Sequence, residues 1–249
     1  MSAPALLSVH GLGKSFGAFT ALKNVSVAFP AHQLTAIIGP NGAGKSTFFN
    51  LISGALPAST GRVLLEGQDV THKAQHEFAR LGIAKSFQIT NVFRQLSAHE
   101  NVRVAAQMRC SRYGLFVPRS ALREVADAAH ALLARVGLAE LANKRAADLA
   151  HGQQRALEIA MALAAQPRLL LMDEPTAGMS PQETVVMMDL ITTLAAERTV
   201  VLVEHKMKLV MGICQRLVVL HQGELLAEGS PHEIRQNAEV KRVYLGNAA

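Results

Sequence analysis

The chain has 249 residues and a mass of 26.7 kDa, which suits one large α/β domain or two small ones with a buried core. It carries 25 basic and 19 acidic residues, and 49% of its residues are hydrophobic, a balance that argues against disorder. No stretch reaches the roughly 18 uncharged apolar residues that span a bilayer, and the N-terminus lacks the continuous apolar core of a signal peptide. Two cysteines are too few for a disulfide framework or a zinc ribbon, which favours a reducing cytoplasm.

The N-terminal part of the chain contains short alternating runs between Gly-rich turns. These runs are SVHGLGKSF, LKNVSVAF and GRVLLEGQDV. Alternation of this kind is typical of half-buried strands. We therefore expect an antiparallel edge on the same core as the strands that follow.

Buried strands and helices then alternate along the chain. Short apolar runs predict strands at 34–39, 168–173, 199–204 and 216–221. Helical patterns separate them at 45–53, where Gly54 is the C-terminal stop, and at 182–196 and 206–214. This order predicts a mostly parallel sheet with helices on both faces.

The middle of the chain, from about Ala98 to Ala147, contains no convincing strand. Ser120 is placed to cap a helix that runs to Val136, and Gly137 ends it. We interpret this part as a helical insertion. Within it, RYGLFVPR (Arg112 to Arg119) brackets apolar residues with arginines, so it either packs into the subdomain core or contacts an anionic membrane surface.

The strongest local motif is GPNGAGKST, which follows a predicted strand and opens a predicted helix. It matches G-x-x-x-x-G-K-[ST], a glycine-rich loop whose backbone N–H groups wrap a polyphosphate. In such a loop Lys45 reaches the β- and γ-phosphates and Ser46 ligates Mg²⁺. The nucleotide-binding residues predicted here are Gly39, Pro40, Asn41, Gly42, Ala43, Gly44, Lys45, Ser46 and Thr47.

A second motif, LLLMDEP, ends an apolar strand in two carboxylates. Ligands of open α/β sheets bind at the carboxyl ends of the strands. Asp173 is expected to hold Mg²⁺ through water, and Glu174 to polarise an attacking water. Without the other motifs, the same segment could also be interpreted as an ordinary surface turn.

Two further segments go beyond a generic phosphate-binding loop. LAHGQQ places Gly152 and Gln153 at the start of a helix, where an anion can bind. VEH places His205 at the end of another strand, where it can contact a γ-phosphate, although a strand-end histidine is often a plain surface residue.

These motifs, taken in order, resemble the ATP-binding cassette of ABC transporters over essentially the whole chain. The resemblance implies a P-loop NTPase (RecA-like) α/β fold with a mostly parallel sheet, an antiparallel N-terminal β subdomain and an inserted α-helical subdomain. It implies that Phe16 stacks on adenine and that Gln88 joins the Mg²⁺ site to the insertion. The segment 177–180 would be the loop that crosses the dimer interface. The signature segment, which contacts the nucleotide of a second ATPase subunit, would be Ala150, His151, Gly152 and Gln153.

A narrower resemblance is to the ATPases of branched-chain amino-acid importers. It rests on GIAKSFQITNVFRQLSAHENV, on EHKMKLVMGICQRLVVLHQGELLAEGSP and on VYLGNAA. It implies an ATP hydrolase on the cytoplasmic face of the bacterial inner membrane. Its partners would be a second ATPase, identical or not, two permease subunits and, indirectly, a periplasmic binding protein. A urea or amide importer is the nearest alternative, and a lipopolysaccharide exporter is more distant.

The sequence departs from the family pattern at two positions. Ala150 replaces the serine of the L-S-x-G-Q signature, which removes a hydroxyl contact worth about 1–3 kcal/mol. Lys206 stands where the group commonly has aspartate. We expect one ATP-binding domain over 1–249, with a catalytic core at about 1–95 and 155–249 and a helical subdomain at about 96–154.

The alternative hypothesis from another functional class is a cassette ATPase that binds nucleic acid instead of powering a transporter. Such relatives carry long coiled coils or tandem cassettes, whereas this chain has one cassette and no heptad tract. No interleaving of aromatic and basic residues and no reading helix accompanies the positive charge. We expect no nucleic-acid partner.

Overall fold

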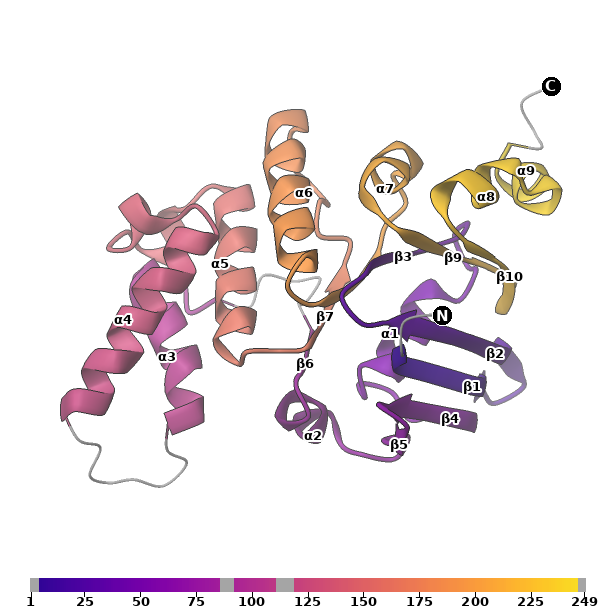
Figure 1. Ribbon diagram of the computed structural model, residues 1–249, viewed down its shortest axis with the longest axis horizontal. Helices are drawn as coiled ribbons and strands as arrows, with labels where there is room; N and C mark the ends of the chain where they lie inside the picture. The colour runs from indigo at the N-terminus through magenta and orange to yellow at the C-terminus, as the bar shows by residue number, and fades with distance from the viewer. Residues whose placement is uncertain (1–4, 86–91, 111–118, 246–249) are drawn as a thin grey trace. The chain divides into compact units, whose positions relative to one another are not determined.

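The computed structural model describes residues 5–85, 92–110 and 119–245. The strands of Figure 1 are β1 (Ala5–Phe16), β2 (Phe19–Pro30), β3 (Leu34–Ile38), β4 (Thr60–Leu65), β5 (Gln68–Asp69), β6 (Ile83–Lys85), β7 (Leu169–Asp173), β8 (Thr199–Val203), β9 (Arg216–His221) and β10 (Glu224–Gly229). The α-helices are α1 (Lys45–Ile52), α2 (Gln75–Arg80), α3 (Ala98–Cys110), α4 (Arg119–Arg135), α5 (His151–Ala164), α6 (Pro181–Ala195), α7 (Met207–Ile213), α8 (Pro231–Gln236) and α9 (Ala238–Leu245). Among the described residues, no helix combines the length and the apolar character that crossing a membrane requires.

The chain divides into two compact units. The first unit comprises residues 1–83, 168–174 and 191–249, and the second comprises residues 84–167 and 175–190. The first holds most of both sheets, and the second holds the helices of the middle of the chain.

The larger sheet has six strands in the order β10-β9-β3-β8-β7-β6. The strands β9, β3, β8 and β7 run parallel, and β10 closes one edge as an antiparallel hairpin with β9. All five residues of β3, of β7 and of β8 are buried, as their continuous apolar runs predict. The register pairs Ile37 and Asp173 with Val203, so β3, β7 and β8 end at the same edge of the sheet.

The N-terminal strands form the expected antiparallel β subdomain on the same core, but as a sheet of their own rather than as an edge of the larger sheet. Their order is β2-β1-β4-β5, and β1 pairs antiparallel with both β2 and β4. Alternation identified these strands but carries no information about the sheet that they join. The antiparallel edge of the six-stranded sheet is instead β10, which the sequence did not predict.

One hydrophobic core joins the two sheets of the first unit. Helix α1 contributes Phe48 and Phe49, which are fully buried together with Phe29 of β2. The rings of Phe29 and Phe48 lie with their centroids 6.3 Å apart. The same cluster contains Ile37 of β3 and Val218 of β9, so α1 is held by both sheets.

The second unit contains the helical insertion. Helices α3, α4 and α5 contact one another pairwise and lie side by side in Figure 1. Helix α4 ends at Arg135, close to the predicted Val136, and Gly137 follows with a φ of 74°. Helix α3 was not predicted. The apolar loop with Arg112, for which packing into the subdomain and contact with a membrane surface were the two alternatives, lies outside the described residues.

Candidate functional site

The glycine-rich loop lies between β3 and α1, in the strand–loop–helix context that the motif requires. Gly44 immediately precedes α1 with a φ of 94°, and an added Cβ would lie 2.8 Å from the carbonyl oxygen of Ala21. A Cβ on Gly39 would collide with the carbonyl oxygen of Leu220. Both positions therefore require glycine. Asn41, Gly42 and Ser46 are exposed along the same loop, so its outer rim is open to a ligand.

Lys45 lies at the start of α1 and is only 9% exposed. Its Nζ donates hydrogen bonds to the carbonyl oxygens of Gly39, at 2.8 Å, and of Pro40, at 3.0 Å. An ammonium group has three donors, so one remains for a phosphate oxygen. Burial lowers the pKa of Lys45, and the charges of Glu174 and Asp173 oppose that shift. The lysine therefore lies within the electrostatic reach of both carboxylates.

Asp173 and Glu174 stand at the end of β7, as the LLLMDEP motif predicts. Asp173 is the last strand residue and is 9% exposed. Glu174 turns away from the strand with a φ of 46°, a left-handed conformation that is uncommon for a residue other than glycine. Its backbone N–H donates to the carbonyl oxygen of Val203 at 3.0 Å, which fixes the turn against β8. Its side chain remains 30% exposed, so it can meet a water molecule.

His205 follows β8 and faces Glu174. Its Nδ1 lies 3.8 Å from Oε1 of Glu174, within ion-pair range for a protonated imidazole but beyond a hydrogen bond. The same nitrogen lies 3.9 Å from Oε2 of Glu204, a fully buried carboxylate that accepts the backbone N–H of His205 at 3.2 Å. Two carboxylates therefore lie within ion-pair range of the same imidazole nitrogen. The sequence did not single out Glu204, because a buried carboxylate inside an apolar strand end has no local motif.

The turn between β9 and β10 supports the phosphate loop, and the sequence also missed it. The N–H of Gly223 donates to the carbonyl oxygen of Ala43 at 3.1 Å, and the carbonyl of Gly223 accepts from the N–H of Lys23 at 2.7 Å. An added Cβ on Gly223 would lie 2.7 Å from the carbonyl oxygen of Ala21. These contacts join segments that are far apart in sequence, so only the fold reveals them.

Phe16 ends β1 with its side chain largely exposed. The residue is 49% exposed, and Nζ of Lys14 lies 5.2 Å from the ring centroid. This distance is typical of a cation–π contact. An aromatic ring that keeps exposed surface at a strand end can stack on a planar base.

The predicted signature segment lies at the start of α5 in the second unit. Ala150 is the N-cap residue, and its backbone N–H donates to Oε1 of Gln153 at 3.0 Å. Nε2 of His151 lies 3.1 Å from the carbonyl oxygen of Ala177 and donates to it. The signature is thereby tied to the loop that precedes α6.

A carboxylate already contacts the N-terminus of α5. Oε1 of Glu183 accepts the backbone N–H of Gly152 at 3.2 Å, and its Oε2 accepts the N–H of Ser180 at 2.9 Å. Hydrogen bonds from Ser180 and from Gly152 lower the pKa of Glu183, so it carries a negative charge at neutral pH. No sequence motif pointed to this residue, because its partner is 31 positions away.

The first unit therefore brings together Lys45, the pair Asp173 and Glu174, and His205, which three separate motifs predicted. Ser46 and Thr47 follow Lys45 in the first turn of α1. The signature residues belong to the other unit. Gln88, the predicted link between the Mg²⁺ site and the insertion, lies outside the described residues.

Comparison with known proteins assigns this site to a family. Residues 22–177 match the model of the ABC transporter family, and residues 224–249 match a second model described as branched-chain amino acid ATP-binding cassette transporter. The high-affinity branched-chain amino acid transport ATP-binding protein LivG of Escherichia coli (strain K12) is 42% identical over 257 residues, covering all of both chains.

Solved structures agree with the sequence relatives. The ADP conformation of MJ1267, an ATP-binding cassette of an ABC transporter, has a TM-score of 0.86 at 30% identity and covers 98% of this chain and 99% of that one. A dimeric cassette, MJ0796 bound to ADP and Pi in a post-hydrolysis state, has a TM-score of 0.75 at 28% identity, over 90% of this chain and 98% of that one. With the phosphate loop, the paired carboxylates and the histidine assembled in one unit, the chain belongs to the ABC transporter family as an ATP-binding cassette.

Proposed function

We propose that this chain hydrolyses ATP at the loop of residues 39–47 and thereby powers an importer of branched-chain amino acids. The observation that carries the ATPase assignment is the approach of His205 to Glu174, at 3.8 Å, beside a buried lysine of the phosphate loop. The observation that carries the substrate class is the match of residues 224–249, together with full-length similarity to LivG.

The phosphate loop would hold the nucleotide by its backbone N–H groups and by Lys45. The buried ammonium meets phosphate charge in a region of low dielectric, where such an interaction is strengthened. Phe16 would stack on the adenine with the ring surface that it leaves exposed. The remaining loop contacts would come from residues 39–44 and from Ser46 and Thr47.

The metal that such a site takes is a hard cation held by oxygen. A hydroxyl at Ser46 and a carboxylate at Asp173, with the amide of Gln88, are ligands of the kind that Mg²⁺ prefers. When bound, Mg²⁺ would neutralise phosphate charge and favour departure of ADP. These three residues would hold it.

Glu174 would act as the general base. Its carboxylate is part-exposed at the strand end, where it can accept the proton of a water that attacks the γ-phosphate. His205 would contact the γ-phosphate and help to hold that water in line. The buried carboxylate of Glu204 fixes the loop on which the histidine stands. We therefore propose Lys45, Glu174 and His205 as the catalytic residues.

The signature segment, residues 150–153, would contact nucleotide bound to a second ATPase subunit. Support comes from dimeric cassettes among the similar structures. The complete assembly would contain two ATPases, two permease subunits and a periplasmic binding protein, with this chain peripheral on the cytoplasmic face of the membrane. The 249 residues would form one domain, with the helical subdomain at about 96–154 carrying the signature.

The general-base assignment is tested by Glu174→Gln. The amide cannot take a proton, so hydrolysis should fall by at least about a hundredfold while the affinity for ATP stays near that of the wild type. Steady-state phosphate release and equilibrium binding of a fluorescent ATP analogue measure the two quantities. The matched control is Glu140→Gln, which changes an exposed carboxylate of the second unit. Hydrolysis by Glu174→Gln at the control rate would remove Glu174 from this role.

The substrate class requires the assembled transporter. We expect the ATPase, reconstituted with its permeases and binding protein, to be stimulated by binding protein loaded with leucine, isoleucine or valine. Urea and short amides serve as the comparison substrates. Stimulation by urea but not by leucine would contradict the substrate and leave the hydrolytic assignment intact.

A further inference from the structure

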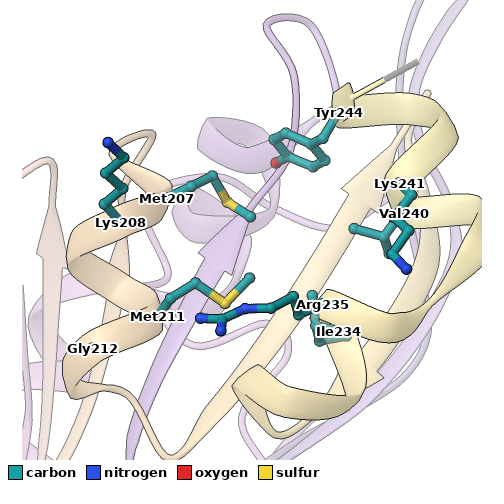
Figure 2. Close-up of a pocket in the computed structure, with 9 residues that line it drawn as sticks. All are labelled: Met207, Lys208, Met211, Gly212, Ile234, Arg235, Val240, Lys241 and Tyr244. Carbon is teal, nitrogen blue, oxygen red and sulfur yellow. The ribbon is translucent and has the colours of Figure 1, made fainter. Parts of the chain in front are cut away.

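A cavity of about 440 Å³ lies in the first unit between α7 and the C-terminal helices α8 and α9. Figure 2 shows its lining residues, which are Met207, Lys208, Met211, Gly212, Ile234, Arg235, Val240, Lys241 and Tyr244. Its volume falls in the range typical of small-molecule sites, roughly 300–1,000 Å³. None of these residues belongs to the proposed nucleotide site.

The walls of this C-terminal cavity are apolar and come from separate helices. Met207 and Met211 of α7 point toward the ring of Tyr244 and the side chain of Val240 across the gap (Figure 2). Ile234 and Val240, which also line the cavity, are 1% and 4% exposed. Methionine side chains adapt to the shape of an apolar partner, so these walls suit an aliphatic chain.

The charged residues that line the cavity all carry the same sign. They are Lys208, Arg235 and Lys241, and the described lining residues include no aspartate or glutamate. The guanidinium of Arg235 reaches across toward Met211, whereas the amine of Lys208 points away from the cavity (Figure 2). Within the part of the chain that the structure describes, Arg235 forms no ion pair with a carboxylate. A guanidinium in this setting favours an anionic partner and recognises carboxylates in particular.

Tyr244 adds a polar group that lacks a partner. Its hydroxyl oxygen is buried and makes no hydrogen bond to any other described residue. Burial raises the pKa of Tyr244, so the group stays a neutral O–H donor. A buried hydroxyl without a partner costs free energy, and an oxygen atom of a ligand would satisfy it.

From these features we propose that the C-terminal cavity binds a small aliphatic monocarboxylate. The aliphatic chain would lie against Met207, Met211 and Val240, and the carboxylate would pair with Arg235. A zwitterionic amino acid fits less well, because its ammonium group would meet cations and no lining carboxylate. Straight-chain fatty acids and branched 2-oxo acids share this chemistry, and the experiment distinguishes them.

The test titrates the full-length chain with three matched probes by isothermal titration calorimetry. Octanoate and 4-methyl-2-oxopentanoate represent the two sources of a carboxylate, and octylamine has a similar apolar chain with the opposite charge. We expect saturable one-to-one binding of at least one carboxylate, and at least tenfold weaker binding of octylamine. The better of the two carboxylates identifies the natural class.

Two variants locate the binding within the cavity. Arg235→Gln removes the cation and should weaken carboxylate binding at least tenfold, and Met211→Trp fills the cavity and should abolish it. Arg242→Gln is the matched control, because Arg242 is exposed on α9 and does not line the cavity. Nucleotide affinity should stay unchanged in all three, which shows that they are folded.

Several outcomes would overturn the proposal. They are the absence of saturable carboxylate binding, equal binding of octylamine, and equal binding to Arg235→Gln and the wild type. A shift in self-association of Arg235→Gln without carboxylate binding would assign the cavity to a second copy of the chain instead. Because Glu174 does not line the cavity, Glu174→Gln should bind the carboxylate as the wild type does, whether or not Glu174 is the general base.

Discussion

Glu183 is the residue whose position bears most directly on the proposed ATP-driven dimerisation. Its carboxylate accepts the N–H of Gly152, one of the backbone donors that the signature would offer to a phosphate of the partner's nucleotide. Ala150 supplies no hydroxyl that could replace this donor. An incoming phosphate would therefore have to displace a charged acceptor and would be repelled by it.

Replacing Glu183 with Gln should ease this competition. The neutral amide oxygen is a weaker acceptor than a carboxylate and does not repel phosphate, so ATP-dependent dimerisation should tighten several-fold. Sedimentation or light scattering at varied protein concentration, in the Glu174→Gln background that retains ATP, measures this change.

The matched control is Glu124→Gln, which removes the same charge from the exposed face of α4. If both variants dimerise alike, the effect is one of net charge. Weaker dimerisation of Glu183→Gln alone would mean that the carboxylate supports the signature rather than competing at it.

At the scale of the elements, several helices begin with the same device. A glutamate three residues after the N-cap accepts the backbone N–H of the N-cap residue, which would otherwise lack a partner. The pairs are Ala74 with Glu77, Ser97 with Glu100, Ser180 with Glu183 and Ser230 with Glu233. These hydrogen bonds lower the pKa of each glutamate below its usual 4.5.

The lowered pKa values predict a loss of stability in acid. Each glutamate has a lower pKa folded than unfolded, so its contribution is fully present above about pH 4.5 and disappears as the pH falls through the folded value. Urea unfolding of the wild type and of Glu100→Gln and Glu233→Gln, at pH 7 and at intervals down to pH 3, measures this contribution. The difference between wild type and variant should shrink toward pH 3. A difference that is the same at every pH would contradict the prediction.

The elements also show what the sequence could predict. Strands β3, β7, β8 and β9 followed from continuous apolar runs, because a strand buried on both faces needs no knowledge of its neighbours. The start of helix α5 followed from the glycine-bearing segment LAHGQQ. The separate N-terminal sheet and β10 depended on pairing partners that local patterns do not specify.

The candidate site likewise contains residues that local motifs predict and contacts that only the fold reveals. Lys45, Asp173 and Glu174 belong to motifs whose spacing reflects the chemistry of one loop or one strand end. The hydrogen bond of Gly152 to Glu183, the buried Glu204 beside His205 and the support of Ala43 by Gly223 arise from tertiary contacts. Such contacts cannot be predicted without the fold.

In the molecule as a whole, α1 links the nucleotide loop to the stability of both sheets. Phe48→Ala should lower the free energy of unfolding by about 3–5 kcal/mol, because it leaves a cavity where the ring meets Phe29. Urea denaturation monitored by circular dichroism measures this loss. The control is Phe19→Ala, which is 67% exposed and should change stability by less than about 0.5 kcal/mol. Equal effects of the two variants would mean that α1 is not part of a shared core.

The strand order of the six-stranded sheet also has a consequence for synthesis on the ribosome. The N-terminal sheet is complete once residue 69 has emerged, but β3 pairs only with β8 and β9, which end at residues 203 and 221. The apolar stretch Leu34–Ile38 therefore has no strand to pair with during most of translation. Long-range pairing of this kind is slow and leaves unpaired edges open to aggregation. The nascent chain should depend on chaperones during this interval, and nucleotide can stabilise it only after β8 and His205 have emerged.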